Sequence, residues 1–420
     1  MGIIKFIRNA ANLGKTVKKY NISIRDIDSL IEHNSLSPTS SGIYVSQEKA
    51  LTIAAFYDGI RQISQIIATL PCVLYKRVAD NRRLPYKEHP LYKMLLYKVS
   101  DRMSSFTFFE TMQMHLIIRG NAYAYISRDA GLRVDKLIII DPQKIEPKLH
   151  DDGTVYFEYK DSQRSIIFRN EEIFHVMATS YDGIKGLGVL ELAREDLGTA
   201  LAERKHNDSF LKNGANANGV LEIPGNLDSE RREELRKALE KKYTGADNAY
   251  KTMILEGGMK YNKIQVTPEE SQFIESRIFS IQEIARWLNM PPHKLKELSR
   301  ATYDNITSEQ ISYITDTLAP WLKRWETAII TQLLGKHQWG YAYAEFSVDT
   351  LLRTDIKSRN EALRIAHQEG VITSNEWRAK LNMNPIDDER ADLTWKPMNM
   401  EFVGDNNSES EGDNDDTIQE

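Results

Sequence analysis

Residues 267–295 have the sequence TPEESQFIESRIFSIQEIARWLNMPPHKL, which contains the start, the apolar face and the end of one long helix. Thr267-Pro268 is a typical helix start, because threonine caps the first amides and proline fits the first turn. A double proline ends the helix. The apolar side chains fall within about 80° of arc and predict a buried face: Ile274, Ile278, Ile281, Ala285 and Leu288. The opposite face carries Gln272, Ser276, Phe279 and Glu283.

A second long helix is predicted upstream, over about residues 190–212, and an Asn-Gly pair ends it. The sequence between the two helices predicts a small unit of mixed structure. Two long helices that bracket an α/β insertion indicate the α+β class. The insertion has strand patterns over 219–223, 252–255 and 260–265, and a charged helix is predicted over 229–244.

The first half of the chain contains both helix and strand patterns. Apolar residues at helical spacing predict a helix over about 50–70, which Pro71 ends, and another over 105–118. Alternating or apolar stretches, most of them closed by turn residues, predict five strands, over 73–76, 121–127, 136–140, 155–159 and 173–177.

The stretch that follows the double proline is polar up to about residue 308. It is short of apolar anchors and contains three cations, Lys294, Lys296 and Arg300. Such a stretch favours a loop. The elements predicted after it are a helix interrupted at Pro320, a strand and two shorter helices, over 309–334, 341–346, 355–369 and 374–381.

Charge is distributed unevenly along the chain. The sequence has 55 basic and 60 acidic side chains, whereas a protein that grips DNA over its whole surface carries a basic surplus. Residues 1–20 contain five cations and no acid, which is typical either of a solvated arm or of a basic amphipathic segment that docks on nucleic acid, membrane or an acidic partner. Residues 401–420 contain eight acids and no cation, and their composition predicts a disordered tail.

The sequence contains no motif for catalysis, cofactor binding or metal binding. The Gly-Lys-Thr string at 14–16 is not a P-loop, because Asn9 stands where the first glycine is needed. His175 is expected to be a hydrogen-bonded core residue and His293 to be exposed. The single cysteine, Cys72, excludes an intrachain disulfide and a multi-cysteine zinc site. We expect no catalytic residue, no cofactor, no metal, no membrane span and no signal sequence.

Eight strings in the chain are informative together, although each alone is weak. They are LIIRGNAYAYISRD (116–129), LIIIDPQKI (137–145), EEIFHVMATSYDGIKGLGVLELA (171–193), FLKNGANANGVLEIPGNL (210–227), MILEGGMKYNKI (253–264), ESRIFSIQEIARWLNMPPHKL (275–295), TLAPWLKRWETAIITQLL (317–334) and EGVITSNEWRAKLNMNPID (369–387). In this order, over roughly residues 45–390, they resemble portal proteins of tailed double-stranded DNA bacteriophages, of the Hong Kong 97 siphovirus type.

The resemblance implies the portal fold and a division of the chain. In chain order, its parts are a basic N-terminal arm and linker (1–40), a wing (41–189), a first stem helix (190–213), an inserted α/β clip (214–266) and a second stem helix (267–290). A tunnel loop (291–308), a tunnel-side helix with a wing strand (309–349), a helical crown (350–395) and an acidic tail (396–420) follow. One departure is that the stretch after the prolines is longer and more basic than in many relatives.

The resemblance also implies a non-enzymatic role. Portal subunits form a dodecameric ring at one capsid vertex, through which double-stranded DNA is packaged and ejected. The implied partners are the terminase large subunit, a head-tail adaptor and the major capsid protein or scaffold. Assembly takes place in the bacterial host cytoplasm, from a phage or a prophage gene, and no membrane is involved.

Six residues are candidates for the lining of the DNA channel. Polar and acidic groups keep DNA mobile, whereas strong phosphate contacts in every subunit would stall it. The candidates on the helix are Gln272, Ser276 and Glu283, and those in the loop are Lys294, Lys296 and Arg300. The alternatives are that the helix residues face solvent or a neighbour, and that the lysines point away and pair with Glu297 or a neighbour.

Two other classes of protein remain as alternatives. An enzyme acting on nucleic acid, such as a nuclease or a motor, would need clustered carboxylates for metal or a P-loop. Another capsid component, such as a head-tail adaptor, is usually shorter and lacks the arrangement of a long helix, an insertion and a second long helix. Activity assays and images of a ring with a central hole would separate these alternatives from a portal.

Overall fold

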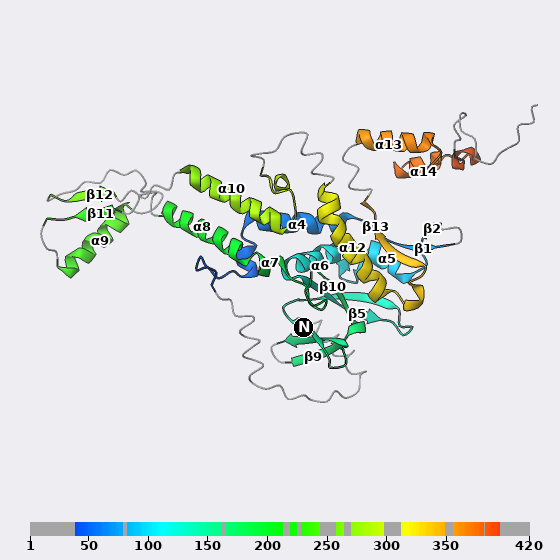
Figure 1. The fold of residues 1–420 in the computed structure, drawn as a ribbon, viewed down its shortest axis with the longest axis horizontal. Coiled ribbons are helices and arrows are strands. Elements are labelled where there is room, and N and C mark those ends of the chain that lie inside the picture. The colour runs from blue at the N-terminus through cyan, green and yellow to red at the C-terminus, as the bar shows by residue number, and fades with distance from the viewer. Residues whose placement is uncertain are drawn as a thin grey trace, which may run out of the picture. The chain divides into compact units, whose positions relative to one another are not determined.

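The computed structural model describes residues 38–78, 82–161, 164–212, 219–224, 228–243, 258–263, 270–297, 312–348, 356–381 and 383–394. The chain forms two compact units, of which the first ends at Phe346 and the second begins at Ser347. The first unit mixes helices with antiparallel sheets (Figure 1), so the predicted α+β class is confirmed.

The core of the first unit is built around Trp325. It lies on α12 (Ala319–Ala328), is fully buried, and packs its indole edge-to-face against Phe109 of α6 (Ser105–Arg119), with the ring centroids 5.1 Å apart. The indole Nε1 donates to Gln113 Oε1 over 2.8 Å. α4 (Ala54–Thr69) packs against α6 (Figure 1). Buried aromatic rings supply large apolar area, so this cluster joins segments more than 200 residues apart.

The sheet β13-β1-β2 covers one side of this core. β1 (Cys72–Arg77) pairs antiparallel with β13 (Ala342–Phe346) and with β2 (Arg83–Pro85). Because side chains alternate along a strand, Cys72 and Leu74 point into the core while their neighbours point outward. The predicted strands over 73–76 and 341–346 are therefore confirmed.

Two further three-stranded sheets share a second apolar cluster. One has the order β10-β5-β6, with strands Ile173–Met177, Asn121–Arg128 and Val134–Ile140, and the other has the order β7-β8-β9, with strands Ile145–Leu149, Val155–Asp161 and Arg164–Arg169. The cluster contains one buried residue from each of the six strands: Tyr123, Ile140, Ile145, Phe157, Phe168 and Ile173. Four of these strands were predicted and two were missed. β7 contains Pro147, and β9 exposes Ile167, so neither has a regular strand pattern.

His175 lies in β10 and is partly buried. Its ring stacks on Tyr123 at 4.6 Å, and its Nε2 is 3.0 Å from Asn121 Oδ1. Gln332 exchanges two hydrogen bonds of 2.7 Å with the His175 main chain. Burial lowers the pKa of His175 to about 4. The prediction of a hydrogen-bonded core histidine is confirmed.

Two long helices lie side by side next to this core. α8 (Arg194–Lys212) and α10 (Glu270–Trp287) are joined by a 2.7 Å hydrogen bond from Trp287 Nε1 to Asp196 Oδ2. Ser280 Oγ also donates to Glu203 Oε2 over 3.0 Å. These helices fall within the ranges predicted for the pair.

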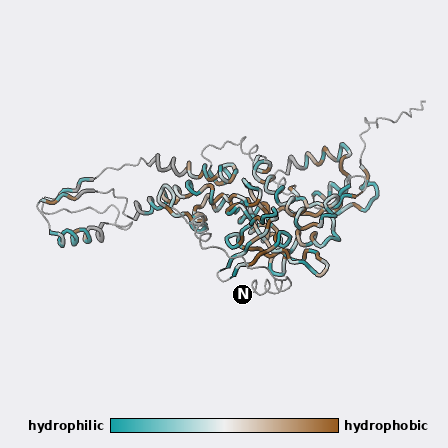
Figure 2. The backbone as a smooth tube through the Cα atoms, turned by 60° about the horizontal axis from the view of Figure 1, so that its bottom comes forward, coloured by the Kyte–Doolittle hydropathy of each residue, from teal (hydrophilic) through white to brown (hydrophobic). Residues whose placement is uncertain are grey.

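The insertion between them contains β11 (Gly219–Glu222), α9 (Ser229–Tyr243) and β12 (Lys260–Lys263), and β11 pairs antiparallel with β12. α9 is hydrophilic along its length, whereas apolar segments concentrate in the core of the first unit (Figure 2). The strand predicted over 252–255 lies outside the described residues.

The helix predicted over 309–334 is described from residue 312 onward. It begins with a π-helical segment, η5 (Tyr313–Leu318), continues as α12 and ends in a second π-helical segment, η6 (Ile329–Leu333). Pro320 lies in the first turn of α12, directly after η5. Proline lacks an amide hydrogen, so the predicted irregularity occurs where the π-helix passes into the α-helix.

The second unit contains two helices, α13 (Ile356–Gln368) and α14 (Ser374–Lys380), which match the predicted pair. Thr373 and Glu376 form a capping box at the start of α14. The remaining short elements of the described residues are α3 (Gln47–Ala50), α5 (Pro90–Leu96), β3 (Lys98–Ser100), β4 (Met103–Ser104), η2 (Asn170–Glu172), α7 (Val189–Leu192), η4 (Pro292–Leu295), η7 (Lys336–Gln338) and η9 (Glu389–Asp392).

Candidate functional site

The residues after α10 are fastened to the start of η5. Asn289 has a left-handed backbone (φ 50°), which turns the chain out of the helix, and Met290 N still bonds to Ala285 O over 2.9 Å. Asn289 Nδ2 donates to Asp316 O over 2.9 Å, and the Thr317 hydroxyl donates to Asn289 O. The residue that follows α10 by two positions is thus hydrogen-bonded to η5, on the two sides of residues 298–311.

The turn η4 is anchored on α4 by apolar contacts. Leu295 is only 7% exposed, and it packs with Leu288 and Met290 around Gly59. A Cβ on Gly59 would lie 2.3 Å from Leu288 Cδ1 and 3.2 Å from Leu295 Cδ2, so any larger residue would require these packed side chains to shift. The expectation that this stretch is short of apolar anchors is wrong for its first residues, because Leu295 is one.

A polar network reinforces the same contact. Gln62 Nε2 on α4 donates to Lys294 O over 2.7 Å and to Asp58 Oδ2 over 2.8 Å. Arg61 Nη2 lies 2.7 Å from Asp58 Oδ1 and holds the carboxylate on its other side. Lys296 Nζ lies 4.0 Å from Asp58 Oδ2, but its side chain is 79% exposed, so this ion pair is weak.

The two described lysines of the turn have different surroundings. Lys294 Nζ lies over the Tyr313 ring, 5.3 Å from its centroid, and Tyr313 is buried. Burial raises the pKa of the Tyr313 hydroxyl above its usual value, so the ring stays neutral beneath the cation. Lys294 is therefore held against the protein, whereas Lys296 extends into solvent.

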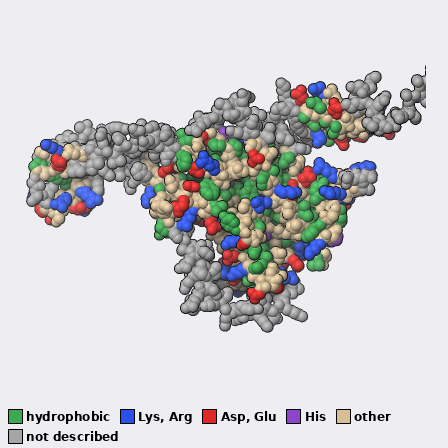
Figure 3. Space-filling model, viewed as in Figure 1, with side chains coloured by type: hydrophobic (Ala, Val, Ile, Leu, Met, Phe, Trp, Pro, Cys, Tyr) green, Lys and Arg blue, Asp and Glu red, His purple; other side chains and the backbone are tan. Residues whose placement is uncertain are grey.

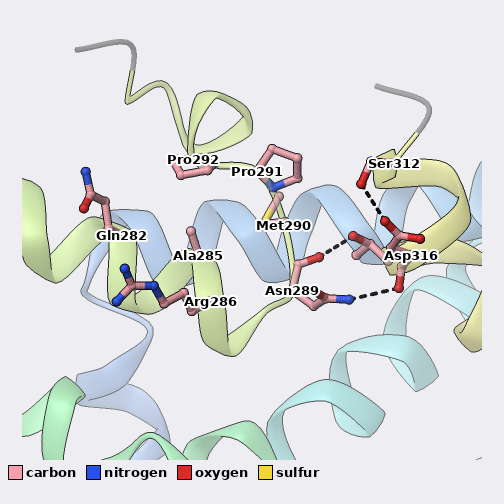
Figure 4. A pocket seen from close by; sticks show the side chains of 10 residues that line it. Gln282, Ala285, Arg286, Asn289, Met290, Pro291, Pro292, Ser312 and Asp316 are labelled. Atoms are coloured by element: carbon pink, nitrogen blue, oxygen red, sulfur yellow. Dashed lines mark hydrogen bonds between the residues drawn. The ribbon is translucent and has the colours of Figure 1, made fainter. Parts of the chain in front are cut away.

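A pocket of about 340 Å³ lies between the end of α10 and the start of η5 (Figure 4). Asp316 accepts hydrogen bonds from Ser312 Oγ at 2.6 Å and from Thr315 Oγ1 at 3.0 Å, and these bonds lower the pKa of its carboxyl group. Arg286 on the other wall is paired with Glu283. Charged groups whose hydrogen bonds and ion pairs are already formed are typical of a structural contact rather than of a catalytic site.

The six predicted channel residues are brought only partly together. Lys294 and Lys296 lie on one turn, and Glu283 lies on the nearby part of α10 with 21% of its side chain exposed. Gln272 and Ser276 belong to α10, but their side chains are outside the described part of the chain, as is the whole of Arg300. His293, expected to be exposed, is partly buried in the turn.

Sequence reasoning missed the three residues of α4 that hold the turn. Arg61 and Gln62 follow Asp58 by three and four positions, so all three lie on one face of the helix. This spacing in the sequence indicates a polar network. Nothing in the local sequence shows that this face contacts a turn 232 residues later.

Other chemistry is absent from the described ranges. No group of three or more His, Cys, Asp or Glu side chains in them could hold a metal ion. Cys72 is buried, and burial raises the pKa of its thiol far above the usual range, so it is an unreactive core residue. Within the same ranges, every helix is too short or too polar to span a bilayer.

Comparisons with known proteins agree with this architecture. The family model described as "Phage portal protein" matches residues 54–382. The portal protein of Enterobacteria phage HK97 is 29% identical over 345 residues, which are 81% of each chain. The probable portal protein of Streptomyces phage phiC31 is 28% identical over 379 residues, which are 87% of this chain and 82% of that protein.

A solved structure has the same fold. A chain in the neck of a native gene transfer agent particle, computed with C12 symmetry, aligns with a TM-score of 0.55 and 19% identity over 87% of this chain and 100% of that chain. Because the family model covers most of the sequence, this chain belongs to the phage portal protein family.

Proposed function

We propose that this chain assembles into a ring at one vertex of a phage capsid, and that double-stranded DNA enters and leaves the capsid through the ring. The observation that carries the proposal is the paired helices α8 and α10 with the inserted β11-α9-β12 unit between them. This layout, together with the family membership, fits a head-tail connector.

The parts of the proposed portal follow the chain. The wing comprises residues 41–189 with the strand in 309–349, the stem is α8 and α10, the clip is 214–266, the tunnel loop is 291–308 and the crown is 350–395. The close packing of Leu288, Met290 and Leu295 against Gly59 supports a fixed base for the tunnel loop on α4. A fixed base would hold the loop at one height in the channel in every subunit.

The channel would be lined by polar side chains with few free cations. Lys294 is held over Tyr313, so Lys296 and Arg300 are the cations of the loop that we propose approach DNA, with Gln272, Ser276 and Glu283 on the stem. A duplex that meets few strong phosphate contacts can slide. In a ring, Lys294, Lys296 and Arg300 of every subunit would together form a basic collar, and the contact with Tyr313 reduces the part that Lys294 takes in it.

The proposed partners are the terminase large subunit during filling, a head-tail adaptor afterwards, and the major capsid protein or scaffold around the ring. The protein itself is proposed to be non-enzymatic, because portal proteins are structural. Assembly in the host cytoplasm into virions is part of the same proposal.

The mass of the purified full-length protein tests the proposal. Twelve copies of a 48.3 kDa chain give a ring of about 580 kDa, which mass photometry resolves from a monomer. Negative-stain images should show a central hole, and assays for ATPase and nuclease activity should be negative. A protein that stays monomeric at micromolar concentration, or that hydrolyses ATP or DNA, would contradict the proposal.

A further inference from the structure

The sheet β13-β1-β2 has an outward face that carries aromatic and charged side chains. Tyr75 and Arg77 of β1 point to this face, opposite the core residues Cys72 and Leu74. Tyr343 lies directly across from Tyr75, and Arg83 directly across from Arg77. We call these four residues the Tyr-Arg face. Figure 3 shows Lys and Arg side chains gathered over β1 and β2.

The four side chains are ordered against one another. The rings of Tyr75 and Tyr343 stack with centroids 5.7 Å apart and planes inclined by 27°. The Arg77 guanidinium lies 5.4 Å from the centroid of Tyr343, and that of Arg83 lies 5.3 Å from the centroid of Tyr75. Guanidinium groups held over rings lose less freedom when they bind a ligand, because their side chains are already ordered.

The charge on this face is only partly neutralised. Arg83 Nη1 lies 3.0 Å from both carboxylate oxygens of Glu345. Arg77 has no carboxylate within ion-pair distance in the described part of the chain, and neither has Lys87, an exposed residue two positions after Pro85 of β2. Arg77 stands directly across from Arg83, whose charge Glu345 offsets, so Arg77 is the arginine of this face that is left to attract an anion.

The chemistry of the face selects the anion. The fork of an arginine matches a phosphate group, and it stays charged at any physiological pH. The two tyrosine rings are occupied by each other and by the arginines, so they are not available to stack unpaired bases. β2 contains Pro85, which limits pairing of another strand at this edge.

We infer that the Tyr-Arg face, with Lys87, binds the phosphate backbone of duplex DNA on the outside of the subunit, independently of sequence. The inference rests on the proposed function in one respect, namely that duplex DNA is the polyanion this protein meets. Contacts to phosphate alone carry no sequence information, so the face would hold DNA of any sequence near the ring.

The test uses the full-length protein and covalently closed circular DNA, which cannot thread the pore of a closed ring. The variant is Arg77→Gln with Lys87→Gln, which leaves the Arg83–Glu345 pair in place. The control is Lys93→Gln with Lys98→Gln, two exposed lysines whose loss changes the charge equally. Binding is measured by sedimentation at several salt concentrations, with mass photometry and thermal unfolding on the same samples.

The expected result is that wild type and control bind the circle, whereas the variant binds on the order of tenfold more weakly at low salt and its log-log salt slope is less steep by about two. Variant binding equal to that of the control overturns the inference. So does displacement of DNA from the wild type by poly-L-glutamate at equal charge concentration, because the face would then recognise acidic protein. If the wild-type protein forms no ring but binds the circle, and the variant binds the circle more weakly, the proposed function is contradicted and this inference is supported.

Discussion

The side-chain amide of Gln62 donates a hydrogen bond to the main-chain oxygen of Lys294, across 2.7 Å and 232 positions of sequence. The same nitrogen donates to Asp58 Oδ2. A side chain of α4 therefore holds the main chain of the first turn of the proposed tunnel loop. Because the bond is to the main chain, the side chain at 294 can change without loss of this anchor.

Replacing Gln62 with leucine should loosen the turn. The substitution leaves Lys294 O without its donor and should cost about 1–2 kcal/mol locally. Amide exchange at Lys296 and Glu297, whose N–H groups close the turn, should then be about five- to thirtyfold faster by mass spectrometry. The control is Gln65→Leu, which removes an exposed bond from the same helix to Glu110. Equal exchange in both variants would show that Gln62 does not hold the turn.

The variant Gly59→Ala should destabilise the protein. In an open helix position alanine is better than glycine by about 1 kcal/mol, but here its Cβ would lie 2.3 Å from Leu288 Cδ1. Crowding in a packed contact costs about 1–3 kcal/mol, so we expect a net loss on chemical unfolding. The matched control is Gly340→Ala, because nothing lies within 4 Å of a Cβ there. A rise in stability for Gly59→Ala would mean that the α4–η4 contact is loose.

The stability of the protein should depend on His175 below pH 6.5. Its pKa is about 4 in the folded protein and 6.5 in an unfolded chain, so the unfolded state takes up a proton first as the pH falls. The stability that this group contributes is complete above pH 6.5 and is lost as the pH falls toward 4, by about 3 kcal/mol at most.

The variant His175→Phe keeps a ring against Tyr123 but cannot be protonated. The difference in unfolding free energy between wild type and variant should therefore narrow, or change sign in favour of the variant, between pH 6.5 and pH 4. Urea titrations at a series of pH values measure it, with pH 7.5 as the internal reference. A difference that stays constant across the series would refute this role for His175.

Neutralising Lys294, Lys296 and Arg300 together should leave ring assembly intact but change the rate of packaging or the retention of packaged DNA. Assembly should survive because the anchor of the turn uses the Lys294 main chain, Leu295 and Gly59. The single variant Lys294→Gln should have a smaller effect than Lys296→Gln, since Lys294 is held over Tyr313. A triple variant that packages and retains DNA like the parent would refute the collar while leaving the portal proposal intact.

The sequence by itself determined most of the elements. The helices over 54–69, 105–119 and 270–287 follow from apolar periodicity with clear start or stop signals, which are local properties of the chain. The family followed from eight ordered strings, and the family model agrees. β7 and β9 escaped prediction because Pro147 and the exposed Ile167 break the local pattern.

Only the tertiary structure decided how the candidate site is held. Lys294 and Lys296 were visible as cations in a polar stretch, but their different roles depend on Tyr313 and Asp58, which come from other segments. Likewise, Arg77 and Arg83 stand opposite each other only because β1 pairs with β2 in one register. Local pattern fixes which face of an element is apolar, whereas the partner of a polar side chain depends on which distant segments burial brings together.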